Sequence, residues 1–85
     1  MKHKVYFLQS LADPQRTYTG YTEQEVEERL TNHNTGSSPV TRLHKPWKII
    51  YFMSFPDVTT ARRFEAYCHT GSGRAWAARH VFALS

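Results

Sequence analysis

Two short runs of β-forming residues open the chain. Lys4 to Gln9 contains Val, Tyr, Phe and Leu and ends before the Asp13-Pro14 turn signal. Arg16 to Tyr21 alternates polar and apolar residues and is rich in Thr and Tyr, which favours a second strand. The short loop between the two runs predicts a β-hairpin.

The apolar positions then change to helical spacing. Thr22 and Glu25 have the Thr-x-x-Glu form of a capping box, in which the hydroxyl and the carboxylate each bind a free backbone N–H. Gly36 and Pro39 are typical of the end of a helix. We therefore expect a helix between these signals, and its inward positions are Val26, Leu30 and His33.

A third strand and a second helix are expected in the second half of the chain. The apolar run Trp47 to Phe52 predicts a buried central strand, which a turn at Pro56-Asp57 follows. Thr59 or Thr60 is a candidate cap for the second helix. Its inward arc contains Ala61, Phe64, Glu65 and Cys68.

Gly71 and Gly73 are expected to stop the second helix, because glycine is frequent at helix ends. Arg74 to Phe82 then predicts a short last helix, with Trp76, Val81 and Phe82 turned inward. The element order is β-β-α-β-α-α. It predicts an α+β fold in which a three-stranded antiparallel sheet is flanked by about three helices, all in one domain over residues 1–85.

Composition narrows the class of partner. The chain has 11 Lys and Arg against 7 Asp and Glu, a formal net charge of +4, and this balance favours an anionic partner such as nucleic acid. Cys68 is the only cysteine, so no intrachain disulfide can form and a reducing compartment, by default the cytoplasm, is expected. No apolar run has the length of a membrane span, so no membrane partner is expected.

Five polar residues fall at positions where chemistry is plausible. Arg29 and His33 are four residues apart on the first helix, so their side chains are neighbours. Tyr6 and Tyr18 lie on adjacent strands and would face this helix if the hairpin register brings them to one face. Glu65 places a carboxylate on an inward helix arc, which is costly unless it is paired or binds a cation. Taken singly, each residue also fits an ordinary packing or surface role.

Together, these residues stand in an ordered set of motifs. The motifs are Val5-Tyr6, Tyr18-Thr19-Gly20-Tyr21-Thr22, Arg29-Leu30-Thr31-Asn32-His33-Asn34, Lys45-Pro46-Trp47 and Ala61-Arg62-Arg63-Phe64-Glu65. The set resembles the GIY-YIG endonuclease family, especially its small stand-alone bacterial members and, more distantly, the amino-terminal nuclease domain of UvrC. Lys4 and Thr19 depart from the family pattern, which has Gly and Ile there.

The resemblance implies a metal-dependent DNA endonuclease with one active site per chain. Glu65 would be the only direct protein ligand of Mg²⁺ or Mn²⁺, Arg29 would hold the phosphate, and Tyr18 would position water or phosphate. The resemblance favours Tyr6 as the general base, and His33, which titrates near neutral pH, stays open as the group that takes or relays the proton. Nicked and branched DNA are candidate substrates, the chain would act as a monomer or weak homodimer, and the substrate contacts would come from Asn34, Arg42, Lys45 and Arg74.

Three alternatives stay open at this point. The first is a zinc site built from His33, His44, Cys68, His69 and His80, although no pair has the usual ligand spacing. The second is a module of the same fold that binds nucleic acid or protein with negligible catalysis. The third is a basic α+β structural domain in which the ordered motifs occur by chance.

Overall fold

The computed structural model describes residues 1–83, so the last two positions of the expected 1–85 domain lie outside the described residues. Three strands pair antiparallel in the order β2-β1-β3. They are β1 (His3–Ser10), β2 (Thr17–Thr22) and β3 (Trp47–Phe55), joined by α1 (Val26–Asn34), a 3₁₀ turn (Arg42–His44), α2 (Val58–Cys68) and α3 (Gly71–His80). The predicted α+β class and the three-stranded antiparallel sheet are confirmed.

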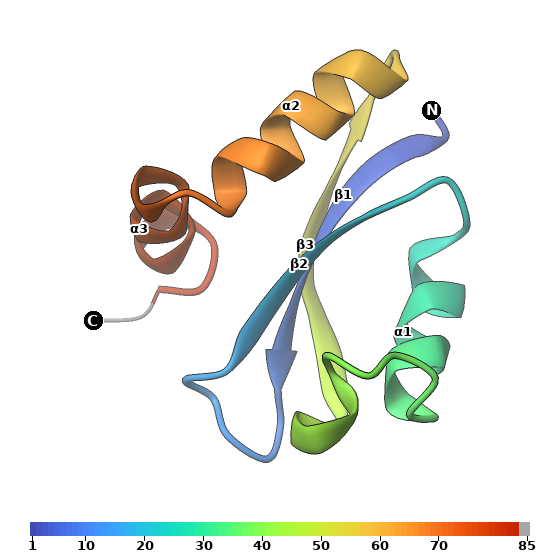
Figure 1. The fold of residues 1–85 in the computed structure, drawn as a ribbon, viewed down its shortest axis with the longest axis vertical. Helices are drawn as coiled ribbons and strands as arrows, with labels where there is room; N and C mark the ends of the chain where they lie inside the picture. Colours follow the sequence, from blue (N-terminus) through green and yellow to red (C-terminus); the bar gives the residue numbers. More distant parts are fainter. Residues whose placement is uncertain (84–85) are drawn as a thin grey trace.

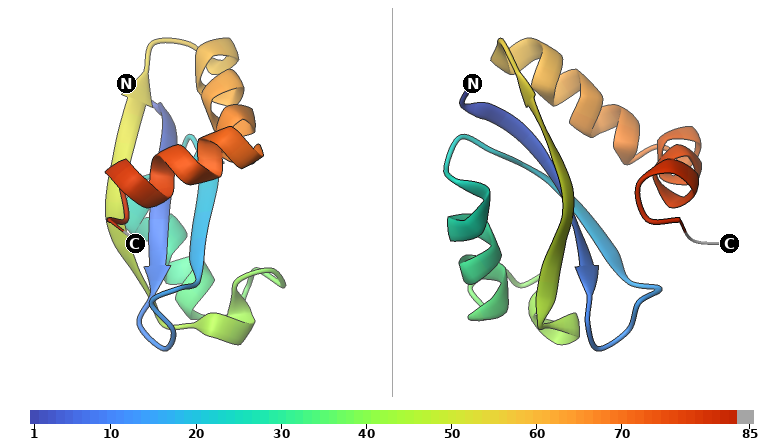
Figure 2. Two further views of the ribbon diagram at one scale, coloured as in Figure 1. Left: turned by 90° about the vertical axis from the view of Figure 1, so that its left-hand side faces the viewer. Right: turned by 180° about the vertical axis from the view of Figure 1, so that it is seen from behind.

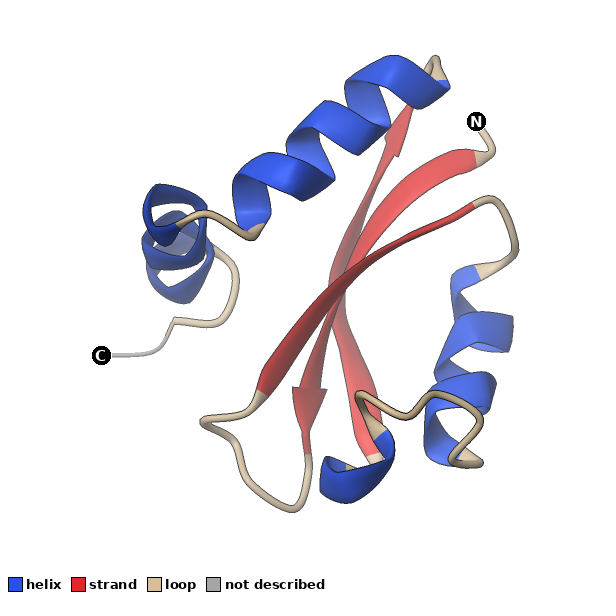
Figure 3. Ribbon diagram, in the orientation of Figure 1, coloured by secondary structure: helices blue, strands red, loops and turns tan. Residues whose placement is uncertain are grey.

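The sheet is the middle layer of three. Helix α1 covers one face of the sheet, and α2 and α3 cover the other face. Figures 1 and 2 show this arrangement from three directions. Colouring by secondary structure makes the same layering plain, with the strands running between the helices (Figure 3). Strand β1 is the central strand, and it supplies both faces with buried residues.

The side chains of β1 alternate between two cores, as the pleat of a strand requires. Val5 and Phe7 enter the core under α2 and α3, together with Ala61, Cys68 and Ala77. Tyr6 and Leu8 enter the core under α1, together with Val26 and Trp47. All four of these β1 residues are fully buried, and an apolar side chain buried to this degree contributes roughly 1.5–3 kcal/mol.

Strand β3 is not the buried central strand that its apolar run predicts. It lies at an edge of the sheet, it extends to Phe55 rather than Phe52, and Tyr51 and Phe52 are 51% and 43% exposed. The run Trp47 to Phe52 is apolar because both faces of this strand meet a core at some point along its length. An apolar run therefore does not distinguish a central strand from an edge strand that is covered on both faces.

The predicted capping box of α1 is wrong. Thr22 belongs to β2, its hydroxyl accepts from the backbone N–H of Gln24, and the N-cap is Glu25, which makes no side-chain cap hydrogen bond. The helix begins only at Val26, because the strand continues through the threonine that would have to cap it. The predicted end near Gly36 is confirmed, since Gly36 follows the last turn with φ of 83°, a conformation that suits glycine.

The starts of α2 and α3 also differ from the predictions. Asp57 caps α2 instead of Thr59 or Thr60, and its carboxylate accepts from the backbone N–H of Thr60 at 2.7 Å. Gly71 does not stop a helix but opens α3, which Thr70 caps by accepting from the N–H of Gly73. An added Cβ on Gly73 would lie 1.8 Å from the Tyr67 carbonyl oxygen, so the glycine allows α3 to pack close to the end of α2.

Candidate functional site

The centre of the candidate site is the phenol of Tyr6, which lies across the neighbouring strand β2. Tyr6 pairs with Gly20, and an added Cβ on Gly20 would come within 2.7 Å of the Tyr6 hydroxyl oxygen and 2.9 Å of the Tyr18 ring. The absence of a side chain at Gly20 thus leaves room for both rings. Tyr18 lies two residues before Gly20 on the same face, so the predicted common face of the two tyrosines is confirmed.

His33 of α1 closes over these rings. Its Nε2 lies 2.8 Å from the Tyr6 hydroxyl, its ring centroid lies 4.9 Å from that of Tyr18, and its side chain is fully buried. Burial, with a smaller effect from the charge of Arg29, lowers the pKa of His33 to about 4. The imidazole is therefore neutral at pH 7, with one nitrogen that donates and one that accepts.

Arg29 brings a positive charge to the same group. Among residues 1–83, its Nε atom is buried and has no hydrogen-bond partner. Burial raises the pKa of Tyr6 above its ordinary value of 10, and the nearby Arg29 guanidinium opposes this rise. A buried guanidinium N–H without an acceptor is costly. Such a group is suited to receive an oxygen from a bound anion.

Thr41 and Trp47 lie behind His33, and the sequence does not predict that they contribute to the site. Thr41 is 1% exposed, and its hydroxyl oxygen lies 2.7 Å from His33 Nδ1. Its carbonyl accepts from the indole Nε1 of Trp47 at 2.8 Å. The sequence offers no periodic signal for Thr41, because it lies in the irregular segment between α1 and β3.

Asn34, a predicted substrate contact, anchors the start of β3. Its amide Nδ2 donates to the Trp47 carbonyl at 3.1 Å, and its Oδ1 accepts from the Trp47 N–H at 2.5 Å. This pair of bonds joins the end of α1 to the strand that carries Trp47. Contact between Asn34 and a substrate would require this bridge to open.

The other predicted substrate contacts, Arg42, Lys45 and Arg74, lie on different sides of the sheet. Arg42 and Lys45 are exposed in the segment beside Gly36, near the carboxyl end of α1. Arg74 is exposed in the first turn of α3, on the other side of the sheet. All three side chains are open to solvent and add positive charge to the surface, while only the first two lie on the side of Tyr6.

Glu65 lies in the layer opposite α1. Helix α2 packs on the face of the sheet that carries Val5 and Phe7, and no hydrogen bond, ion pair or ring contact within residues 1–83 joins Glu65 to the Tyr6 group. Its carboxylate is 21% exposed and lies 3.7 Å from Arg62 Nη1 and 3.7 Å from His69 Nε2. The sequence predicts Glu65 within the inward arc of α2, whereas it lies partly exposed at the flank of that arc, and the five predicted catalytic residues do not form one contiguous contact cluster.

The zinc alternative finds no support in the described part of the chain, where no three or more His, Cys, Asp or Glu side chains lie close enough to share a metal ion. Cys68 is buried in the core, and burial with the charge of Glu65 raises its pKa to about 11. The side chain is therefore a neutral thiol that packs as an apolar group. Within the same residues, no helix combines the length and hydropathy needed to cross a membrane.

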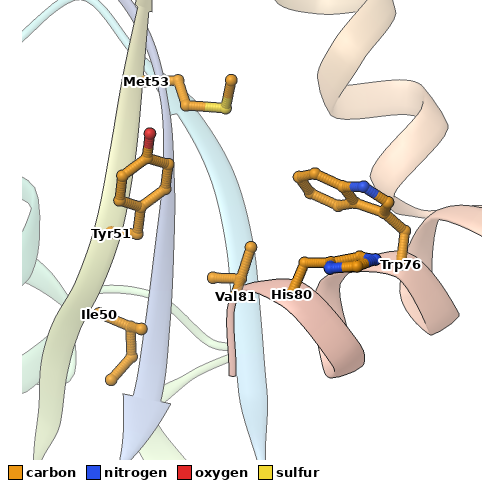
Figure 4. A pocket seen from close by; sticks show the side chains of 6 residues that line it. All are labelled: Ile50, Tyr51, Met53, Trp76, His80 and Val81. Atoms are coloured by element: carbon orange, nitrogen blue, oxygen red, sulfur yellow. The ribbon is translucent and has the colours of Figure 1, made fainter. Parts of the chain in front are cut away.

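A cavity of about 320 Å³ lies away from the polar group, between β3 and α3 (Figure 4). Its wall is mostly apolar and is lined by Ile50, Tyr51, Met53, Trp76, His80 and Val81. Its one imidazole, that of His80, packs against the Trp76 ring at a centroid distance of 5.8 Å. The polar group of Tyr6, Tyr18, Arg29 and His33 therefore lies on the α1 side of the sheet and not in this cavity.

Comparison with known proteins gives one positive finding. The family model described as the GIY-YIG catalytic domain matches residues 2–76. The match spans β1, where Tyr6 lies, through α2, where Glu65 lies, and reaches into α3. None of the curated proteins matches the chain.

Proposed function

Because the chain belongs to the GIY-YIG catalytic-domain family, a family of endonucleases, we propose that it is a divalent-metal-dependent enzyme that hydrolyses phosphodiester bonds in DNA. The observation that carries the proposal is the polar group in which the fully buried Tyr6 and His33 lie beside Arg29, whose Nε is buried without a hydrogen-bond partner among residues 1–83. A domain of this size gains little stability from burying such residues unless they have partners. The orphaned Nε of Arg29 has the chemistry of a phosphate contact.

Arg29 would bind the non-bridging oxygens of the scissile phosphate. Its guanidinium stays charged at any working pH and offers several donors in one plane. These donors would stabilise the extra negative charge that the phosphate gains in the transition state. Tyr18 is half-buried beside His33 and would orient the phosphate or the attacking water with its hydroxyl.

The general base would be Tyr6 or His33. Tyr6 has a pKa above its ordinary value, which is badly matched to neutral pH, and Arg29 opposes that rise. His33 is neutral at pH 7 and has an acceptor nitrogen on one side. Both are fully buried, so either can reach a water only once substrate or metal has opened the group.

Glu65 would hold the metal ion. Its carboxylate is partly exposed, and its two basic neighbours lie at 3.7 Å, beyond hydrogen-bond distance, so its oxygens are available. A lone carboxylate fits Mg²⁺ or Mn²⁺, which are commonly held by one or two carboxylates together with waters and substrate oxygens. When bound, the ion would supply positive charge to the leaving oxygen.

The free edge of β2 would bring the two sides together. Strand β2 carries Tyr18 on the face of α1 and Tyr21 on the face of α2. Arg62 of α2 lies over the Tyr21 ring at 4.0 Å from its centroid, and Glu65 lies 3.7 Å from the same guanidinium, so the Glu65 carboxylate is close to β2. A DNA strand that crosses this edge would meet Tyr18 and Arg29 on one side and Glu65 on the other.

A cleavage assay tests the proposal. Nicked, branched and supercoiled DNA would be incubated with the protein and Mg²⁺ or Mn²⁺, and then with chelator. We expect metal-dependent cleavage that falls by roughly 10²–10³-fold in Arg29→Ala, the usual loss for one transition-state donor. Glu65→Gln should abolish the metal-dependent cleavage, whereas the matched control Glu27→Gln, which changes an exposed carboxylate on α1, should cleave normally.

Two results would overturn this function. The first is no cleavage by the natural protein with either metal. The second is full cleavage by Glu65→Gln. Steeply salt-dependent DNA binding without turnover would instead favour the non-catalytic binding module.

A further inference from the structure

The buried hydrogen-bond chain behind Tyr6 ends at Thr41. The atoms run from the Tyr6 hydroxyl through His33 Nε2 and Nδ1 to Thr41 Oγ1, over distances of 2.8 Å and 2.7 Å. Thr41 is held in place by the Trp47 indole, which donates to its carbonyl at 2.8 Å. The hydroxyl of Thr41 is therefore fixed against the side of the imidazole that faces away from Tyr6.

Two arrangements of hydrogens satisfy this chain, because the imidazole is neutral and each hydroxyl has one hydrogen. In the first, Tyr6 donates to Nε2, and Nδ1–H donates to Thr41. In the second, Thr41 donates to Nδ1, and Nε2–H donates to the Tyr6 oxygen. The two arrangements differ in which hydroxyl hydrogen is left over.

The first arrangement leaves the Thr41 hydrogen without an acceptor. Thr41 is 1% exposed, and within residues 1–83 its hydroxyl makes no hydrogen bond other than the one to His33. A buried hydroxyl hydrogen without an acceptor is costly. The second arrangement uses the Thr41 hydrogen and leaves that of Tyr6 for the neighbouring Tyr18 side chain, since besides burial a hydrogen bond with Tyr18 contributes to raising the pKa of Tyr6.

We propose that Thr41 is a positioning residue that holds His33 in its Nε2–H tautomer, so that His33 donates to the Tyr6 oxygen instead of accepting from it. The inference rests on the proposed nuclease function for its consequence. In this tautomer the acceptor nitrogen of His33 faces Thr41, so His33 cannot take a proton from Tyr6 or from a water beside it. The base would then be the phenolate of Tyr6, formed when its hydroxyl proton is released to solvent and stabilised by the His33 Nε2–H donor and the nearby Arg29 charge.

The tautomer can be measured without catalysis. In ¹⁵N-labelled protein at neutral pH, long-range ¹H–¹⁵N spectra distinguish a protonated from an unprotonated ring nitrogen. We expect His33 with Nε2 protonated and Nδ1 unprotonated. A His33 signal with Nδ1 protonated in the natural protein would overturn the inference at once, whether or not the protein cleaves DNA.

Two variants of Thr41 separate positioning from packing. Thr41→Val keeps the shape and removes the hydroxyl, and we expect the preference for Nε2–H to fall by roughly fivefold, the effect of one hydrogen bond. In the cleavage assay, kcat should fall while KM changes little, because Thr41 does not touch the substrate. Thr41→Ser should restore both the tautomer and the rate.

The outcomes for the two proposals differ. A natural protein with Nε2 protonated but without cleavage supports the role of Thr41 in positioning and counts against the nuclease function. Active Thr41→Val with an unchanged tautomer overturns the role of Thr41 and leaves the nuclease function standing. Should Thr41→Val fail to fold, the spectrum of the natural protein still decides the tautomer.

Discussion

The two faces of the sheet are built from different chemistry although one strand serves both. On the side of α2 and α3, Phe7 packs against the rings of Tyr51, Phe64 and Phe82 in a core without buried charge. On the side of α1, its neighbour Tyr6 meets an imidazole instead. A shift of one residue along β1 thus separates an aromatic core from a buried polar group.

This difference indicates that one face of the sheet stabilises the fold and the other face serves binding and chemistry. The aromatic face gains stability from apolar area and from ring contacts, which add about 0.5–1.5 kcal/mol per pair. The polar face keeps a neutral histidine, the Tyr6 phenol and a guanidinium nitrogen without a partner among residues 1–83 out of water, which costs stability unless a ligand uses them. The aromatic face therefore supports a polar face whose arrangement serves binding and chemistry.

The largest expected effect is the difference in stability loss between substitutions on the two faces of β1. Phe7→Ala removes a fully buried ring from the aromatic core, and we expect a loss of about 3–5 kcal/mol, enough to unfold much of a small domain. Tyr6→Phe keeps the packing on the other face and should cost only about 1–3 kcal/mol, from the lost hydrogen bond. Urea unfolding monitored by circular dichroism measures both. Equal losses of unfolding free energy in the two variants would contradict the different roles of the two faces.

The pH dependence of stability should come from the polar face. The folded pKa of His33 is about 4, below its ordinary 6.5, so between these values the unfolded chain binds a proton that the folded chain does not. Stability therefore rises with pH in this window, and up to about 3 kcal/mol is lost as the pH falls from 6.5 to 4. The free energy of unfolding should be measured by urea titration at steps from pH 4 to pH 7.5.

His33→Asn is the control for this window. The variant has no imidazole to protonate, so its stability should change less between pH 4 and pH 6.5 than that of the natural protein. Asp57 and Glu23 also have lowered pKa values, from the Thr60 N–H and the Tyr21 hydroxyl respectively, and their effects cancel in the difference. Parallel pH profiles would show that His33 is not held neutral by burial.

The next effect tests the fit of the two tyrosines over β2. Gly20→Ala would place a Cβ within 2.7 Å of the Tyr6 hydroxyl, and overpacking of this kind costs about 1–3 kcal/mol. Gly71→Ala is the matched control, because its Cβ would meet no atom within 4 Å, and alanine in a helix is slightly stabilising. A crystal structure or thermal unfolding of both variants measures the effect. Equal stability in the two variants would contradict the close fit at Gly20.

The fold and part of the site follow from local patterns in the sequence. The alternation along β1 and the turn to β2 predict the hairpin, and helical spacing predicts that Arg29 and His33 share a face. The position of β3 does not follow, because an apolar strand can add to either side of a hairpin. Thr41 could not be predicted either, since the path of an irregular segment decides which hydroxyl reaches the imidazole.

The placement of Glu65 shows the limit of helical periodicity. Spacing from Ala61 and Cys68 predicts that Glu65 lies within the inward arc of α2, and the side chain is found partly exposed at the flank of that arc. It carries no information about which face of the sheet that helix covers. This choice depends on the path of the chain after β3, which is a property of the whole topology.

The smallest expected effect comes from the N-cap residues of α1 and α2, the helices on the two faces of the sheet. Helix α2 is capped by Asp57, which accepts from the backbone N–H of Thr60 at 2.7 Å and from its hydroxyl at 3.1 Å. Asp57→Ala should cost about 1 kcal/mol, the usual value of a side-chain cap. The N-cap of helix α1, Glu25, makes no such bond, so Glu25→Ala should change stability by less than about 0.5 kcal/mol. Thermal unfolding of the two variants at pH 7 gives the comparison.

The direction of this last comparison matters more than its size. If α1 is held by its capping residue, Glu25→Ala should match Asp57→Ala, and the polar face would depend on local helix stability. If α1 is held by its contacts, only Asp57→Ala should be destabilising, because the bonds from Asn34 to the Trp47 main chain and from His33 to Tyr6 fix α1 to the sheet. The structure favours the second result, since the hydrogen bonds that anchor α1 come from its last turn, where the candidate site lies.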